Sequence, residues 1–171
     1  MEICKYEHAK FLIGRYDQLY DVVNSKANFY ITINTFLAGA LGAGYAAWAH
    51  KAVLPGWFVC LLAAAILLSL FSIIYTLLAI HPFTKGNIDG QDCGSLIFFG
   101  TVAGLKLPSF LEKYNSQSEE DIAADAYAQA HCLATGLTLK FARLQSVSRM
   151  AIACFILVGI LTFYSIINHI I

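Results

Sequence analysis

Charge is scarce in this chain of 171 residues. Only 13% of the residues are charged, whereas a soluble domain usually carries about 25%. The 11 basic and 11 acidic residues cancel, so no global charge favours nucleic acid as a partner, and any anion site has to be local. With 58% hydrophobic residues, the composition predicts an integral membrane protein.

The residue types that build metal sites and catalytic centres are few and scattered. The five cysteines and five histidines include no CxxC pair, no HExxH motif and no Cys/His cluster. They predict neither a zinc site nor a disulfide framework. The glycines of residues 39–44 lie in an apolar run with no preceding strand, unlike a dinucleotide-binding loop. We therefore expect no enzyme activity, no catalytic residue, no cofactor and no bound metal.

Three uncharged runs are long enough to cross the ~30 Å hydrocarbon core of a bilayer as helices. These runs cover residues 27–48, 52–80 and 150–167. The first two form a helical hairpin around the turn at Pro55-Gly56. We therefore predict an all-α membrane protein with three transmembrane helices, namely the hairpin at residues 28–80 and a third helix at residues 150–168.

The remaining segments predict a cytoplasmic layer of long amphipathic helices. Residues 1–27 repeat apolar side chains at a spacing that suits packing against another helix. Residues 81–149 begin with a polar, glycine-rich loop and end in a helix that Ser118 and Asp121 can cap. The expected apolar stripe of that helix is Ile122, Ala126, Ala130, Leu133, Leu137, Phe141, Leu144 and Val147. The short apolar stretch 96–105 is either a helix docked on the bundle or a segment at the membrane interface.

The distribution of lysine and arginine predicts the orientation. Four of these residues lie in residues 1–28 and six in residues 81–149, whereas the turn at residues 48–56 carries one. The positive-inside rule then places the N-terminus and residues 81–149 in the cytoplasm, and the C-terminus outside.

The first span also carries residues that lipid does not require. Asn34, with Thr32 and Thr35 beside it, forms a polar patch, and small residues recur at four-residue spacing within 38–47. Small residues let membrane helices approach closely, either within one subunit or between subunits. Because three spans enclose no ion path, a pore needs several copies, and we expect a homo-oligomer, with a tetramer favoured. Thr32, Asn34 and Thr35 are candidate pore-lining residues, and the alternative for Asn34 is a structural hydrogen bond to another helix.

Several separate motifs resemble those of one known family in their order and spacing. They are Lys26-Ala27 with Asn34 eight residues after the lysine, Ile80-His81-Pro82, Leu96-Ile97-Phe98-Phe99-Gly100, Tyr114, then Asp121, Asp125 and Gln129, and finally Lys140-Phe141-Ala142-Arg143-Leu144. From Lys26 to the C-terminus the chain resembles the transmembrane effectors of Pycsar antiphage systems. The family often has aspartate two residues before the lysine, where this chain has Asn24.

The resemblance implies a protein of the bacterial inner membrane that acts during phage infection. A cyclase or nucleotidyltransferase encoded nearby makes a nucleotide signal, and the effector then permeabilises the membrane and arrests growth. By this resemblance we expect the ligand to be a cyclic nucleotide or a short oligonucleotide, which either opens or closes the channel. The alternative is a holin-like or structural membrane oligomer, or a small transporter, without nucleotide control.

A nucleotide carries phosphate, so its site needs fixed cations, preferably arginine for bidentate contact. The candidate cations are Lys26, Lys140, Arg143 and Arg149, which the expected topology places near one membrane depth. Phe98, Phe99 and Tyr114 are candidate stacking partners for the base. The alternative is that these cations only anchor the helices at anionic headgroups.

Overall fold

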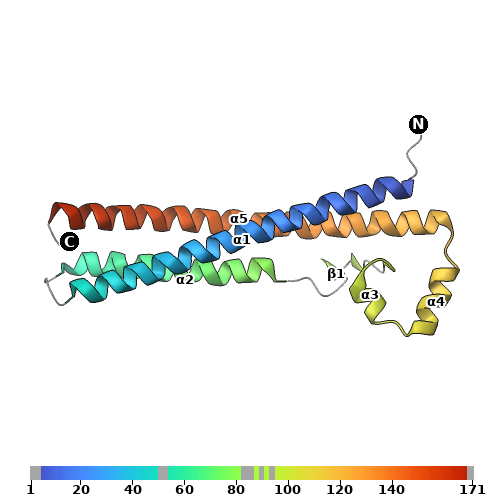
Figure 1. The fold of residues 1–171 in the computed structure, drawn as a ribbon, viewed down its shortest axis with the longest axis horizontal. Coiled ribbons are helices and arrows are strands. Elements are labelled where there is room, and N and C mark those ends of the chain that lie inside the picture. The colour runs from blue at the N-terminus through green and yellow to red at the C-terminus, as the bar shows by residue number, and fades with distance from the viewer. Residues whose placement is uncertain (1–4, 50–53, 82–86, 89–90, 93–94, 169–171) are drawn as a thin grey trace. The chain divides into compact units, whose positions relative to one another are not determined.

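The computed structural model describes residues 5–49, 54–81, 87–88, 91–92 and 95–168. The helices, labelled in Figure 1, are α1 (Lys5–Trp48), α2 (Gly56–Ile80), α3 (Phe99–Ala103), α4 (Leu107–Asn115) and α5 (Glu119–Ile167). The strands β1 (Asn87–Ile88) and β2 (Gln91–Asp92) pair antiparallel, with Asn87 opposite Asp92. The expected all-helical class is thus confirmed for the described residues, with one short strand pair that the sequence did not predict.

The three prolines of the chain stand where helices begin or end. Pro55 is the N-cap residue of α2, and His81 at its C-terminal end is extended, with φ −51° and ψ 128°. The extended conformation follows from the next residue, Pro82, because proline disfavours helical geometry in the residue before it. Pro108 lies in the first turn of α4, where its missing N–H costs no helical hydrogen bond.

The two longest helices contain no proline and run unbroken. α1 has 44 residues and α5 has 49, which at about 1.5 Å per residue is more than twice the thickness of the hydrocarbon core. The domain boundaries expected near residues 27 and 149 lie inside these helices, so no break in the backbone marks either one.

The chain divides into two compact units. The first comprises Met1–Val23 and Pro82–Phe141, and the second comprises Asn24–His81 and Ala142–Ile171. The first unit therefore holds the polar start of α1, α3, α4 and the first part of α5. The second unit holds α2 with the apolar parts of α1 and α5.

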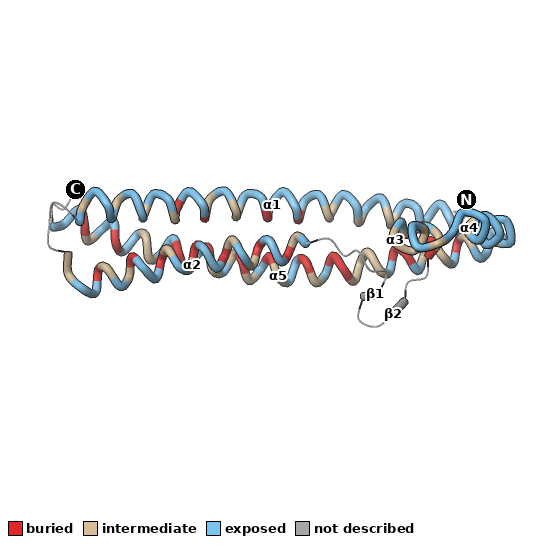
Figure 2. The backbone as a smooth tube through the Cα atoms, turned by 90° about the horizontal axis from the view of Figure 1, so that it is seen from below, coloured by how far each residue is buried: buried red, intermediate tan, exposed pale blue. Residues whose placement is uncertain are grey.

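The buried positions of the long helices follow one another in alternating steps of three and four residues. On α2 they are Phe58, Leu62, Ala65, Ser69, Ser72, Thr76 and Ala79. On α5 they include Ala126, Ala130, Leu137, Lys140, Leu144, Val147, Ala151, Cys154 and Leu161. Figure 2 shows them as red segments that recur along the helices. This repeat of about 3.5 residues is that of left-handed coiled-coil packing.

The repeat corrects one member of the apolar stripe expected on α5. The buried residue after Leu137 is Lys140, which is 5% exposed, whereas Phe141 is 37% exposed. The four-residue step from Leu133 to Leu137 is followed by a step of three in a 3.5-residue repeat. Lysine therefore occupies the core position for which phenylalanine was expected.

In the second unit, α1, α2 and α5 pack as a three-helix bundle. Its apolar cluster consists of Phe58, Leu62, Ala65 and Leu161, with partly buried neighbours that include Leu41, Trp48, Leu157 and Tyr164. The rings of Trp57 and Tyr164 meet edge to face, with centroids 4.6 Å apart. This aromatic contact ties the start of α2 to the end of α5.

Two described helices, α2 and α5, are long and apolar enough to cross a membrane. Only 28% of the apolar window of α2 and 22% of that of α5 is buried. A core helix of a soluble protein would be mostly buried, so these values suit helices that face lipid. Two of the three expected spans are thereby supported, and the span expected in α1 stays a prediction.

Candidate functional site

A reciprocal cap fixes the start of α5 in the first unit. The amide and the hydroxyl of Ser118 donate to Asp121 Oδ2 at 2.9 and 2.7 Å, and the Asp121 amide donates to Ser118 Oγ at 3.2 Å. The Ser118 hydroxyl, and then its amide, hold the pKa of Asp121 below its ordinary value, because both donate to the charged form. The cap expected from the sequence is confirmed.

Asp125 lies one turn further along α5 and anchors the segment that precedes α3. Its Oδ2 accepts the Leu96 amide at 2.9 Å, and Oγ of the buried Ser95 accepts the Ile97 amide at 3.1 Å. Gln129 follows after another turn and is 8% exposed, and its Oε1 has no hydrogen-bond partner among the described residues. Asp125 thus orients the segment that carries Phe98 and Phe99, while Gln129 offers a free acceptor inside the first unit.

Lys140 is the candidate cation that belongs to the first unit, where it lies against α1. Its Nζ is 5.2 Å from the centroid of the Tyr20 ring, within the range of a cation–π contact. Tyr20 donates its hydroxyl to the Leu133 carbonyl at 3.2 Å. Burial, and secondarily the charge of Asp17, raise the pKa of Tyr20. Lys140 and Tyr20 therefore join α5 to α1 through a buried charge.

The other three candidate cations belong to the second unit. Arg143 donates from Nη1 to the Leu78 carbonyl at 3.1 Å, and so satisfies a carbonyl in the last turn of α2, where the helix itself supplies no donor. Lys26 and Arg149 are exposed. The four cations thus have different surroundings: a buried ring contact, a helix C-terminus and two open surfaces.

The candidate stacking residues lie at α3 and α4. The ring centroids of Phe98 and Phe99 are 4.9 Å apart, and Phe99 is 67% exposed. Tyr114 stacks on Phe110 with centroids 5.9 Å apart. The exposed rings of Phe99 and Tyr114 therefore present faces on which a base can stack.

Tyr114 also lines a pocket of about 630 Å³ between the start of α1, the end of α4 and the start of α5. The other lining residues are Lys5, Tyr6, Glu119, Glu120, Ile122 and Ala123. Ligand pockets commonly have volumes of about 300–1,000 Å³, and this pocket lies within that range. Two tyrosines and two carboxylates suit the base of such a ligand better than its phosphate, which leaves Lys5 as the cation of the pocket.

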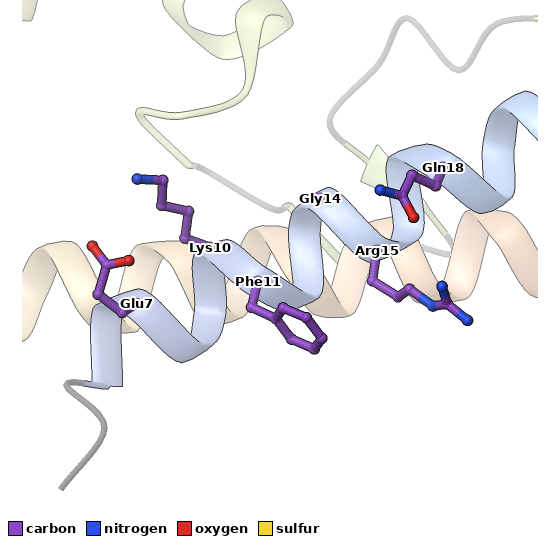
Figure 3. Close-up of a pocket in the computed structure, with 6 residues that line it drawn as sticks. All are labelled: Glu7, Lys10, Phe11, Gly14, Arg15 and Gln18. Carbon is purple, nitrogen blue, oxygen red and sulfur yellow. The ribbon is translucent and has the colours of Figure 1, made fainter. Parts of the chain in front are cut away.

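A second hollow, of about 440 Å³, lies on one face of α1 (Figure 3). Its lining residues are Glu7, Lys10, Phe11, Gly14, Arg15 and Gln18. A Cβ added at Gly14 would meet nothing within 4 Å, and in Figure 3 Lys10 and Phe11 extend to opposite sides of the helix. A hollow whose walls all belong to one helix has the form of half a helix–helix interface.

The polar patch of α1 divides between the inside and the outside of the second unit. Asn34 is fully buried and donates from Nδ2 to Ser72 Oγ on α2 at 3.2 Å. Thr32 and Thr35 are exposed. The sequence left two roles open for Asn34, and its contact with Ser72 is the structural hydrogen bond to another helix. Pore lining by the three residues stays a prediction.

Sequence reasoning missed a layer of buried polar groups on α2. Ser69 Oγ and Cys154 Sγ are 3.0 Å apart, and the Thr76 hydroxyl donates to the Ser72 carbonyl at 2.7 Å. Ser69, Ser72 and Thr76 follow one another in steps of three and four residues in an otherwise apolar helix. From that spacing in the sequence, the three residues could have been predicted to lie together on the packed face of α2.

Metal-binding and redox groups are sparse in the described parts of the chain. No group of three or more histidine, cysteine, aspartate or glutamate side chains there could hold a metal ion. Cys60 and Cys154 are free thiols, whereas Cys132 is disulfide-bonded. The scattered cysteines did not predict that bond.

The model of the Pycsar effector protein domain matches residues 8–167 of the chain. No curated protein and no solved structure matches it. The matched range covers nearly the whole chain, takes in α2 and α5, and begins well before Lys26, where the resemblance in motifs starts. The chain therefore belongs to the Pycsar effector family and is a membrane effector of antiphage defence.

Proposed function

We propose that the protein is a homo-oligomeric channel of the bacterial inner membrane under the control of a nucleotide signal. The observation that carries this proposal is the family match over residues 8–167. A cyclase or nucleotidyltransferase encoded nearby supplies the signal during infection. Ion flow through the channel then depolarises the membrane and arrests growth.

The outer surface of the second unit supports the membrane placement. The large apolar residues exposed on α2 and α5 include Leu67, Leu70, Phe71, Ile74, Leu77, Ile152, Phe155, Ile156, Ile160 and Phe163. Full burial of such a side chain gains about 1.5–3 kcal/mol relative to water, and covering the exposed part of each with lipid gains a share of this. In this proposal the apolar part of α1 is the third span, and the N-terminus lies in the cytoplasm by the positive-inside rule.

The ion path in this proposal lies between copies, with a tetramer favoured, because three spans alone enclose no channel. Thr32, Asn34 and Thr35 of α1 line it. Thr32 and Thr35 are already exposed, whereas Asn34 has to leave Ser72 in order to face the path. Opening of the channel therefore involves a rotation or displacement of α1.

In this proposal Lys26, Lys140, Arg143 and Arg149 are candidates for binding phosphate, and Phe98, Phe99 and Tyr114 are candidates for stacking on a base. The pocket beside Tyr114 supports base binding there, with Lys5 as its cation. Glu119 and Glu120 there can accept hydrogen bonds from the exocyclic amino group of a base. A cyclic nucleotide or a short oligonucleotide fits this chemistry.

Ion flux through liposomes that contain the purified protein tests the proposal. Cyclic mononucleotides and short oligonucleotides are added one at a time, and a potential-sensitive dye reports depolarisation. We expect one of these ligands to change the flux at least severalfold relative to buffer. Flux that no nucleotide changes would match a holin-like pore, and complete absence of flux would contradict channel function.

A further inference from the structure

The three helices of the second unit differ in what they expose. α2 and α5 expose leucine, isoleucine and phenylalanine, the side chains that suit contact with lipid. The exposed residues of α1 in the same unit are mostly small or polar, with Phe29, Phe36 and Tyr45 as the large apolar ones. The small and polar ones include Asn28, Thr32, Thr35, Gly39, Ala40, Gly42, Ala43, Ala46 and Ala47. In a membrane, small residues favour the close approach of another helix.

Gly39 and Gly42 lie in the middle of this surface and have open space beside them. A Cβ added at either glycine would meet nothing within 4 Å. The small residues at these two positions therefore do not serve packing within one copy of the chain. Packing between copies is the other use of such residues.

The same face of α1 continues toward its N-terminus in a seven-residue repeat. One row of exposed residues is Phe11, Gln18, Ser25, Thr32, Gly39 and Ala46, and the other is Arg15, Val22, Phe29, Phe36 and Ala43. The two rows alternate in steps of three and four residues, as the a and d positions of a coiled coil do. We call these two rows the outward seam of α1.

The hollow of Figure 3 lies at the start of the outward seam, around Gly14. Its lining residues are three, four and seven positions apart, which is the arrangement of the holes that receive a knob from a neighbouring helix. Glu7, Lys10 and Arg15 give the rim charges of both signs. A surface with both signs of charge complements a copy of itself better than it complements a purely anionic or cationic partner.

We propose that the outward seam is where a second copy of this chain docks, with α1 lying parallel to α1. The proposal rests on the homo-oligomer of the proposed function and names its interface. Copies inserted in one membrane share an orientation, so their α1 helices run parallel. In that arrangement Asp21 and Lys26, both exposed, flank the seam at g and e positions and pair between copies. Gly39, which is a residue of the seam, and Gly42, which is the g position beside it, mark the closest approach of the two helices.

The variants Gly39→Leu and Gly42→Leu test the seam. The Cβ of each leucine meets nothing within 4 Å in the single chain, and leucine has the higher helix propensity. Between two copies, the same side chain separates the helices. Gly159→Leu is the matched control, since Gly159 on α5 is also exposed and also has nothing within 4 Å.

Native mass spectrometry in one detergent gives the distribution of oligomers for the wild type and the three variants. We expect Gly39→Leu and Gly42→Leu to raise the apparent dissociation constant about tenfold or more, and Gly159→Leu to leave it unchanged. The seam would be overturned if the wild type is oligomeric and neither Gly39→Leu nor Gly42→Leu changes the distribution of oligomers. It would also be overturned if all three variants change that distribution equally. Either result would leave the proposed channel standing. A wild type that stays monomeric in detergent and in lipid would overturn the oligomeric channel itself.

Discussion

Replacing Asn34 and Ser72 by apolar residues is expected to leave the bundle about as stable as the wild type. Asn34 Nδ2 donates to Ser72 Oγ across the α1–α2 interface, while Asn34 Oδ1 is buried without a partner among the described residues. Asn34 Nδ2 also donates to the Tyr30 carbonyl of its own helix at 2.8 Å, so the pair has one bond between helices, one bond within α1 and one unsatisfied acceptor. The double variant Asn34→Leu/Ser72→Ala removes all three.

The magnitudes of the favourable and unfavourable terms nearly cancel. A hydrogen bond between membrane helices contributes about 0.6–2 kcal/mol. A buried acceptor without a donor costs about 1–3 kcal/mol. Asn34→Leu alone leaves the Ser72 hydroxyl without its donor, so we expect that variant to lose up to about 2 kcal/mol. The double variant should lie between about 1 kcal/mol below and about 2 kcal/mol above the wild type.

Unfolding by SDS in mixed micelles, followed by far-ultraviolet circular dichroism, measures these differences. A loss of more than about 3 kcal/mol in the double variant would refute the reasoning, because it would mean that Asn34 Oδ1 has a partner that the single chain does not supply. Ion flux in liposomes decides the second role of this residue. If Asn34→Leu assembles normally and changes the flux, Asn34 lines the pore, whereas loss of assembly would assign it the structural role.

Three further predictions concern the first unit and the ligand. Lys140→Ala and Arg143→Ala should each weaken nucleotide binding about tenfold or more by calorimetry, since each removes a cation worth at least about 1.5 kcal/mol to phosphate; unchanged affinity in both, with the oligomer intact, would leave them as membrane anchors. Tyr114→Ala should weaken binding by about 1–3 kcal/mol through lost stacking, whereas Tyr114→Phe should keep most of the affinity; equal losses in the two variants would contradict stacking. The lowered pKa of Asp121 means that its charged form stabilises the start of α5. This stabilisation is complete above the unfolded-state pKa of about 3.9 and is lost as the pH falls through the lower folded-state pKa. The protection factors of the amides of residues 118–122, which are exchange rates corrected for the intrinsic pH dependence, should therefore fall in acid in the wild type, and Asp121→Asn should remove that change.

Several features of this protein were determined by the sequence itself because their causes are local. The uncharged runs identify segments able to cross a membrane, and the α2 and α5 helices contain two of them. Pro55 and Pro82 bound α2, and the Ser118–Asp121 cap starts α5. Each of these signals acts through residues within one or two helical turns, so no knowledge of the packing is needed. The order of the short motifs likewise pointed to the family that the domain match confirms.

The tertiary structure decided which side of each long helix faces inward. One residue corresponds to about 100° of rotation around a helix, so a small error in the phase of an apolar stripe exchanges a buried and an exposed position. Phe141 was expected in the core, but the 3-4 alternation set by packing places Lys140 there. Asn34, Thr32 and Thr35 formed one patch in the sequence, yet the bundle buries the first and exposes the other two. Which face packs depends on the neighbouring helices, which are distant in sequence.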